Sequence, residues 1–165
     1  MKKTVIIFGT STGTCEELAG RIGAKLGVDN IINVTDLDDS IIAANDNLIL
    51  GTSTWGAGEL QDDWYDGVRT IGAADLSGKT VALFGCGDSE SYPDTFVGGM
   101  AELYNAARKA GADIVGAVSV DGYTFDDSES VVDGKFVGLA LDEVNEDDKT
   151  DERIDAWVQQ ILSSL

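Results

Sequence analysis

Hydroxyl side chains and glycines gather directly after the first apolar run, which spans residues 4–8. After Gly9 this segment contains Thr10, Ser11, Thr12, Gly13, Thr14 and Cys15. If a helix starts here, successive backbone N–H groups can surround an anion, and the helix dipole favours its negative charge. The lysine of a P-loop and the G-x-G-x-x-G of a dinucleotide site are both absent. The pattern predicts a phosphate site, and the alternative is a threonine-rich helix cap.

Two later loops each place an aromatic side chain among small residues. The first loop contains Thr54, Trp55, Gly56, Ala57 and Gly58. The second loop contains Cys86, Gly87, Asp88, Tyr92, Asp94 and Phe96. An exposed aromatic side chain flanked by glycine is suited to stacking on a flat ring. The alternatives are that Trp55 folds back onto the core and that Tyr92 is an ordinary surface residue.

The elements that must position these loops alternate along the chain. Apolar runs predict strands at residues 4–8, 31–34, 48–50, 80–84 and 114–120. Helical spacing of apolar residues predicts helices over 16–27, 64–72 and 96–111, and a short helix at 41–42. This order predicts a doubly wound α/β fold, in which a five-stranded parallel sheet has helices on both faces. All three loops then leave the carboxyl edge of the sheet, where ligands bind in such folds.

The end of the sequence departs from this simple alternation. A polar stretch at 121–133 precedes a second strand-like run at 136–141, which indicates an insertion in the last strand. Apolar residues between Ile154 and Leu165 then form one stripe of a closing amphipathic helix. The length of 165 residues and the lack of a linker or repeat favour one domain over residues 1–165.

Composition narrows the range of functions. Thirty acidic residues against eleven basic ones give a formal charge of -19, which repels nucleic acid and anionic lipid and attracts basic protein surfaces. There is no histidine, so Ser-His-Asp catalysis and His-ligated metal sites are excluded. The apolar run near the N-terminus is too short for a signal peptide or a membrane span. The two cysteines lack C-x-x-C spacing, and a reducing, cytoplasmic setting is expected.

Taken together, these motifs resemble the flavodoxin family over essentially the whole chain. Thr10, Thr12 and Gly13 match the [ST]-x-T-G-x-[ST] phosphate loop. The segment 56–64 after Trp55 resembles the second flavin loop, and Gly87-Asp88 with Tyr92 resembles the third. The segment 136–143, which follows the insertion, resembles the long-chain subgroup.

The resemblance implies a low-potential single-electron carrier that uses FMN and has no catalytic or metal-binding residues of its own. Residues 10–15 would hold the phosphate, and Trp55 and Tyr92 would sandwich the isoalloxazine. Backbone atoms of 56–57 and 86–88 would meet the polar edge of the ring. Cys15 stands where the family has Thr or Ser, so a strong hydroxyl donor is replaced by a weak thiol and weaker phosphate binding is expected. The sequence does not show whether Cys15 and Cys86 interact.

The expected partners are basic faces of redox proteins, such as a ferredoxin/flavodoxin reductase and low-potential acceptors, and the expected state is a monomer. A rival interpretation is a flavin-dependent reductase of the same fold, which needs a second pocket for nicotinamide or quinone. Another rival is a phosphoacceptor receiver, which needs acidic residues after the first strand, where this chain has Gly9, Thr10 and Ser11.

Overall fold

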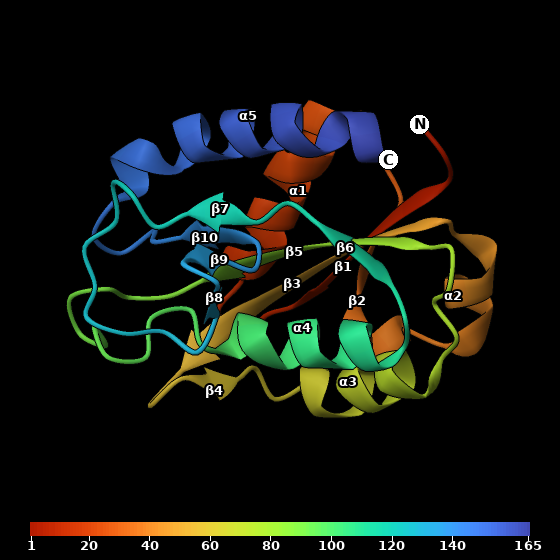
Figure 1. The fold of residues 1–165 in the computed structure, drawn as a ribbon, viewed down its shortest axis with the longest axis horizontal. Coiled ribbons are helices and arrows are strands. Elements are labelled where there is room, and N and C mark those ends of the chain that lie inside the picture. The colour runs from red at the N-terminus through yellow and green to blue at the C-terminus, as the bar shows by residue number, and fades with distance from the viewer.

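The computed structural model describes all residues from 1 to 165 and is built around one parallel sheet (Figure 1). Its parallel strands are β1 (Thr4–Gly9), β2 (Ile31–Asn33), β3 (Asn47–Trp55), β5 (Thr80–Cys86), β6 (Asp113–Val115) and β10 (Leu139–Leu141). The spatial order is β10-β5-β3-β1-β2, and β6 also pairs with β5. Strand order reverses between β1 and β3, so the carboxyl ends of these two strands border the crevice where such sheets bind ligands.

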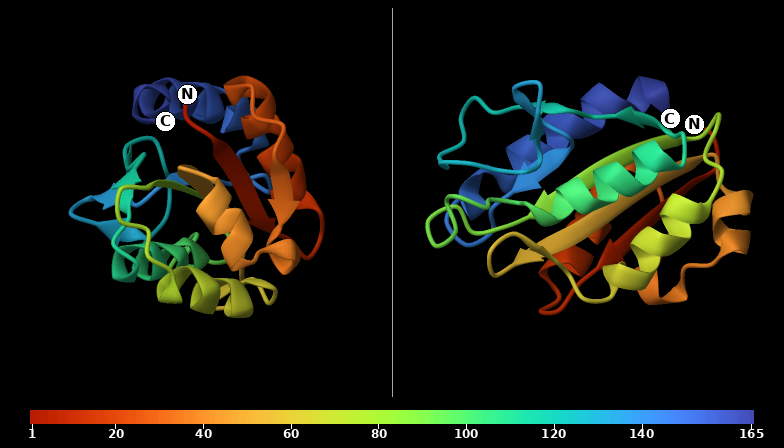
Figure 2. Two further views of the ribbon diagram at one scale, coloured as in Figure 1. Left: turned by 90° about the vertical axis from the view of Figure 1, so that its right-hand side faces the viewer. Right: turned by 60° about the horizontal axis from the view of Figure 1, so that its bottom comes forward.

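Helices cover both faces of the sheet, which confirms the doubly wound architecture (Figure 2). One face carries α1 (Thr14–Leu26) and α5 (Thr150–Ile161), and the other carries α3 (Trp64–Ala73) and α4 (Gly99–Lys109). The short helix α2 (Asp39–Ala44) forms where a short helix was expected. Each face buries one large indole whose N–H is satisfied. Trp64 Nε1 donates to the Gly51 carbonyl at 2.8 Å, and Trp157 Nε1 donates to the Gly116 carbonyl at 2.9 Å.

The insertion is confirmed, but the fifth strand ends earlier than the sequence suggested. Gly116 has a φ of 88°, a left-handed conformation that suits glycine and ends β6. The chain then forms a separate antiparallel sheet, β7-β9-β8, from β7 (Val118–Ser119), β8 (Val131–Val132) and β9 (Lys135–Phe136). It returns to the main sheet at β10, which pairs in parallel with β5. The predicted single strand over 114–120 is therefore wrong beyond Val115, and only 139–141 of the run at 136–141 joins the main sheet.

Two other boundaries differ from the sequence prediction. The helix predicted from residue 96 begins at Gly99, because Val97 adopts a left-handed φ of 47° and interrupts helical geometry. Strand β3 runs on to Trp55 and pairs with β4 (Glu59–Leu60), so the predicted loop around Trp55 is a tight hairpin. No helix has the length and apolar character needed to cross a membrane.

Candidate functional site

A hollow of about 320 Å³ opens at the carboxyl ends of β3 and β5, beside the start of α1. Its lining comes from four loops and comprises Thr12, Thr14, Ser53, Thr54, Trp55, Gly56, Cys86, Gly87, Asp88, Tyr92, Glu143 and Val144. Two other hollows, of about 340 and 510 Å³, border the inserted segment. Only the first is lined by exposed aromatic side chains, so its chemistry and not its size makes it the candidate site.

The segment between β1 and α1 forms an open cradle of backbone amides. Gly13 has a φ of 92°, and its N–H donates to Thr10 Oγ1 at 3.0 Å, which fixes the turn. No side chain caps α1, so the N–H groups of its first turn lack the usual side-chain acceptor. The hydroxyls of Thr12 and Thr14 lie 3.4 Å apart at the edge of the hollow. The cradle is therefore suited to an anion.

Trp55 stands at the end of β3 as one wall of the hollow. Its side chain is 41% exposed, and its Nε1 donates to Ser53 Oγ at 2.9 Å. The hairpin turn that follows contains Gly56 at a φ of 51° and Gly58 at a φ of 84°. Both positions have a left-handed backbone conformation, which glycine adopts at little cost and which is costly for other residues. The indole is thus fixed in position and still exposed, as stacking on a ligand requires.

Tyr92, which is 47% exposed, borders the same hollow from the loop after β5. A tight turn holds this loop: the Tyr92 N–H donates to the Asp88 carbonyl at 2.9 Å. The Asp88 carboxylate accepts from the Ser91 N–H at 3.0 Å and from Asn145 Nδ2 at 2.8 Å. These two bonds lower the pKa of Asp88, so a negative charge persists at the edge of the hollow.

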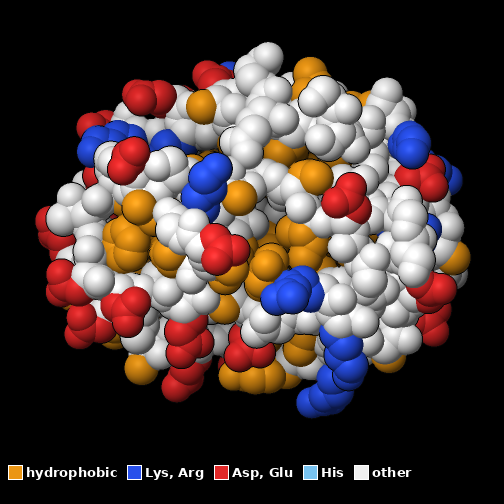
Figure 3. Space-filling view, in the orientation of Figure 1, with side chains coloured by type: hydrophobic (Ala, Val, Ile, Leu, Met, Phe, Trp, Pro, Cys, Tyr) orange, Lys and Arg blue, Asp and Glu red, His pale blue; other side chains and the backbone are white.

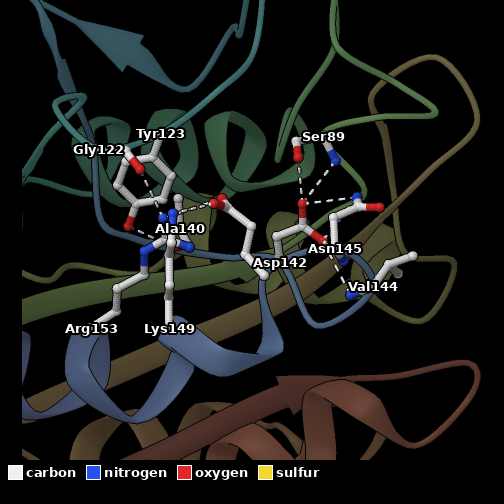
Figure 4. Close-up of polar contacts among 10 residues, drawn as sticks. Ser89, Gly122, Tyr123, Ala140, Asp142, Val144, Asn145, Lys149 and Arg153 are labelled. Carbon is white, nitrogen blue, oxygen red and sulfur yellow. Dashed lines mark hydrogen bonds and ion pairs between the residues drawn. The ribbon is translucent and has the colours of Figure 1, made fainter.

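A fully buried carboxylate, Asp142, joins the loop after β10 to the loop that carries Tyr92 (Figure 4). It accepts hydrogen bonds from the N–H and the hydroxyl of Ser89. The N–H groups of Val144 and Asn145 also donate to it, at 3.1 and 2.9 Å. Burial alone would raise the pKa of Asp142, but the hydrogen bonds outweigh burial and lower it. Asp142 therefore acts as an ionised clamp between two loops.

The inserted segment braces the same loop from its other side. The N–H groups of residues 126 and 127 both donate to the Pro93 carbonyl, at 2.8 and 3.0 Å. The hydroxyls of Ser128 and Ser130 donate to the carbonyls of Phe96 and Val97. The left-handed Val97 is thus held by a partner more than thirty residues away in sequence. The loop bearing Tyr92 depends on the insertion for its shape.

A second network holds the insertion against α5. Arg153 lies 3.9 Å from the centroid of the Tyr123 ring, and its Nη2 donates to the Gly122 carbonyl and to Glu146, both at 3.2 Å (Figure 4). The Tyr123 hydroxyl donates to the Ala140 carbonyl at 2.8 Å. Burial is the main cause that raises the pKa of Tyr123, to about 12, so the hydroxyl stays a donor. The inserted segment, which supports the loop bearing Tyr92, is therefore itself fixed to α5 and β10.

The structure brings together members of all three predicted loops. Nine predicted residues line the hollow: Thr12, Thr14, Thr54, Trp55, Gly56, Cys86, Gly87, Asp88 and Tyr92. The others lie in the same loops without lining it: Thr10, Ser11, Gly13, Cys15, Ala57, Gly58, Asp94 and Phe96. Phe96 is in the core, 1% exposed, and packs on Phe125 and Phe136. Because the spacing of Phe96 matches that of the helix residues that follow it, the sequence did not indicate a buried aromatic side chain in the loop.

Cys15 and Cys86, from the first and third loops, are buried free thiols that belong to one apolar cluster. The neighbouring Cys86 thiol, together with burial, raises the pKa of the Cys15 thiol. The Cys15 side chain is fully buried among apolar residues, so its thiol faces the core and not the anion cradle. The hydroxyl of a Thr or Ser at this position would be buried as well and would not reach the cradle. The buried side chain of Cys15 therefore gives no reason to expect weaker phosphate binding.

Sequence reasoning missed three residues that line the hollow: Ser53, Glu143 and Val144. Glu143 and Val144 follow β10, the fourth strand end at this edge of the sheet. The strand-like run that ends at Leu141 could have indicated Glu143 and Val144, because residues that follow a parallel strand lie at the carboxyl edge of the sheet.

The fold and the hollow define a class: a doubly wound α/β protein with a site for a flat, anionic ligand. Comparison with known proteins specifies the family. Residues 6–157 match the model of the flavodoxin family. The flavodoxin of Helicobacter pylori is 42% identical over 100% of this chain and 99% of its own length. Flavodoxin 1 of Azotobacter vinelandii is 41% identical, over 96% of this chain and 94% of its own.

Solved structures agree with the sequence comparisons. A crystal structure of Fusobacterium nucleatum flavodoxin bound to flavin mononucleotide superimposes with a TM-score of 0.93. It is 34% identical and covers 100% of this chain and 99% of its own. The chain belongs to the flavodoxin family. It is therefore an FMN-binding electron carrier and not an enzyme.

Proposed function

We propose that this chain holds FMN with the phosphate on residues 10–15 and the isoalloxazine between Trp55 and Tyr92. Backbone atoms of 56–58 and 86–88 border the polar edge of the ring, and Asp94 lies beyond Tyr92. The main support is that two half-exposed aromatic side chains border one hollow beside uncapped helix amides. Phe96 has no part in this site, because its side chain is in the core.

The donor set fits the group. A phosphate monoester needs several N–H or hydroxyl donors, which the start of α1 and the threonines at its edge provide. A planar ring system needs flat apolar faces, which the indole and the phenol supply. Bound FMN supplies the one-electron redox chemistry, and the protein sets its potential.

Carboxylates near the hollow favour a low potential. Asp88 and Glu143 both line it; Arg21 Nη1 lies 3.5 Å from Glu143 Oε1, whereas Asp88 is in no ion pair. Two like charges about 10 Å apart at an effective dielectric of about 20 repel by roughly 1.7 kcal/mol. A one-electron potential shift of about 100 mV corresponds to roughly 2.3 kcal/mol. A few such carboxylates are therefore enough to make the addition of negative charge at the ring markedly harder.

The partners we propose are redox proteins with basic docking faces: a ferredoxin/flavodoxin reductase as donor and low-potential proteins as acceptors. The four loops around the hollow, 9–17, 53–63, 86–98 and 142–148, contain many acidic residues and no lysine or arginine. In Figure 3 acidic side chains predominate along the lower left of the molecule, the end at which these loops gather in Figure 1. A cationic surface would be steered to this end.

Salt dependence tests the partner proposal. Reduction of the FMN-loaded chain by a ferredoxin reductase should slow by about tenfold or more as ionic strength rises from low to physiological values. A rate that does not change with salt would contradict docking through the acidic end.

We further propose that the chain belongs to the long-chain subgroup and acts as a single-domain cytoplasmic monomer. The three-stranded insertion between β6 and β10 supports the subgroup. All the parallel strands belong to one sheet, which supports a single domain. The high net negative charge opposes self-association. Sedimentation of the FMN-loaded chain at physiological salt should give the mass of one chain, and a dimer mass would contradict this.

A further inference from the structure

A buried amide side chain, that of Gln61, connects the hairpin after Trp55 to the anion cradle. Gln61 lies between β4 and α3 and is only 2% exposed. Its Nε2 donates to Ser11 Oγ at 3.2 Å, across 50 positions of sequence. Gln61 does not line the hollow, so its contact with the phosphate end of the site passes through Ser11.

The contacts of Asp63 fix which end of the amide faces Ser11. The Asp63 N–H donates to Gln61 Oε1 at 3.1 Å, and an N–H group can only donate. The Asp63 carboxylate accepts from Gln61 Nε2 at 3.1 Å, and a carboxylate can only accept. A flipped amide would lose both bonds, so the group that faces Ser11 is the amide donor.

Two neighbouring residues hold Gln61 in this place. The Gln61 carbonyl accepts from the Trp64 N–H at 3.0 Å, in the turn that leads into α3. A Cβ on Gly9, at the end of β1, would collide with Gln61 Oε1 and with the Trp64 ring. Glycine at position 9 therefore lets Gln61 lie over the end of β1, beside the segment that forms the cradle.

The bond from Gln61 decides what the Ser11 hydroxyl can offer to a ligand. A hydroxyl has one proton to donate and two lone pairs with which to accept. Because Gln61 Nε2 occupies a lone pair of Ser11 Oγ, the Ser11 proton points away from Gln61, and at this exposed position it is free for a ligand. Thr10 Oγ1 likewise accepts from the Gly13 N–H, so its proton is also left to donate.

We infer that Gln61 is a positioning residue for the flavin phosphate: its amide holds the Ser11 hydroxyl as a donor to the phosphate oxygens. A doubly ionised phosphate monoester offers only acceptor oxygens, so a hydroxyl committed to donation matches it. Because this role rests on the proposed function, its test separates loss of the phosphate contact from loss of FMN binding as a whole.

A double-substitution cycle on the ratio of FMN to riboflavin affinity, measured by flavin fluorescence in the full chain, tests the role of Gln61. Riboflavin lacks the phosphate, so the ratio isolates the phosphate contact. Ser11→Ala should lower the ratio by about tenfold, which corresponds to one hydrogen bond to a charged group. Gln61→Met, similar in size and without an N–H donor, should lower it by about fivefold. In the Ser11→Ala background, Gln61→Met should change the ratio by less than about twofold, because it acts only through Ser11.

Gln160→Met is the matched control. The Gln160 amide also makes a hydrogen bond, to the Ala117 carbonyl at 2.8 Å, but it lies on α5 outside the hollow, so its loss should leave the ratio unchanged. Riboflavin affinity should be the same in all these variants. Gln61→Asn keeps the amide but is one methylene too short to meet Asp63 and Ser11 together, and it replaces Gln61→Met should that variant not fold.

The outcomes separate this role from the proposed function. Equal losses for FMN and riboflavin in Gln61→Met, or a fall in the ratio that persists in full in the Ser11→Ala background, would overturn the role and leave Gln61 a structural residue. An unchanged ratio in Ser11→Ala with a lowered ratio in Gly13→Ala would overturn the role while the phosphate placement holds. Unchanged ratios in both, or a folded chain that takes up no FMN, would contradict the proposed function and this role together.

Discussion

The two ends of the candidate site are built in different ways. The phosphate end is largely one contiguous segment, fixed by the bond from Gly13 to Thr10 and by the start of α1, with one long-range bond from Gln61 Nε2 to Ser11 Oγ. The ring end depends on partners far away in sequence: the insertion, and Asp142 after β10. We infer that the phosphate end is set by local sequence and the ring end by tertiary structure. Substitutions far from the hollow should therefore disturb one end and spare the other.

Two ligands distinguish these ends experimentally. Riboflavin has the ring system of FMN without the phosphate, so its affinity reports on the ring end. The ratio of FMN to riboflavin affinity reports on the phosphate end. For each of the following variants we predict a change in these two quantities or in the free energy of unfolding.

Removing the Asp142 carboxylate should have the largest effect. Asp142→Ala leaves the buried N–H and hydroxyl of Ser89 without their acceptor, and each unsatisfied buried group costs about 1–3 kcal/mol. The part-buried N–H groups of Val144 and Asn145 lose the same acceptor. We expect the free energy of unfolding in urea to fall by roughly 3 kcal/mol or more. Asp147→Ala, at an exposed position nearby, should change it by less than about 0.5 kcal/mol. Equal values for both variants would show that the clamp contributes nothing.

Trp55→Ala should weaken FMN and riboflavin alike, because it removes a face of the ring site. Loss of one stacking partner costs about 1–3 kcal/mol, so affinity for both ligands should fall by roughly thirtyfold in fluorescence titration. Tyr65, also exposed at 47% but on α3 outside the hollow, gives the control Tyr65→Ala, which should bind normally. A Trp55→Ala chain with undiminished riboflavin affinity would remove Trp55 from the ring site.

The double substitution Ser128→Ala with Ser130→Ala tests the brace directly. Two buried hydrogen bonds to the carbonyls of Phe96 and Val97 disappear, each worth about 1 kcal/mol. We expect riboflavin affinity to fall by roughly tenfold and the FMN-to-riboflavin ratio to stay constant. The exposed pair Ser163→Ala with Ser164→Ala should do nothing. A change in the ratio would show that the two ends are not independent.

Gly13→Ala is the converse case, because it alters only the phosphate end. A side chain at this position meets nothing within 4 Å, so the cost comes from the φ of 92° and is about 1 kcal/mol. FMN affinity should fall severalfold while riboflavin affinity is unchanged. Equal losses for both ligands would contradict a separate phosphate end.

Acidification should destabilise the chain through the carboxylates whose pKa values folding lowers, among them Asp88 and Asp142 at the ring end. Folding lowers the pKa values of Asp88 and Asp142, so their stabilising contribution is complete above the unfolded value of about 3.9. It is lost as pH falls through the lower folded values. Urea unfolding from pH 7 down to about pH 3 should therefore show falling stability only below about pH 4.5, with a shallower slope in Asp88→Asn. A slope that Asp88→Asn leaves unchanged would assign the acid sensitivity elsewhere.

The same comparison explains what could be predicted from the sequence. Residues 10–15 and the glycines around Trp55 owe most of their local geometry to neighbours in the chain, so composition and spacing were enough to predict the two loops. The parallel sheet with helices on both faces followed from the alternation of elements. The contacts of Ser130 with Val97 and of Asn145 with Asp88 join residues 33 and 57 positions apart, and no local pattern marks them. Phe96 was misplaced because spacing alone cannot separate a buried loop aromatic from a helix residue.

The central claim is that one FMN binds between Trp55 and Tyr92 with its phosphate at the start of α1. Titration of FMN into the full chain, followed by flavin and tryptophan fluorescence, tests it most directly. The account predicts saturation at one FMN per chain, with quenching of both signals and with a smaller loss of tryptophan emission in Trp55→Phe. A folded chain that takes up no FMN, or that binds it with Trp55 emission unchanged, would contradict the account.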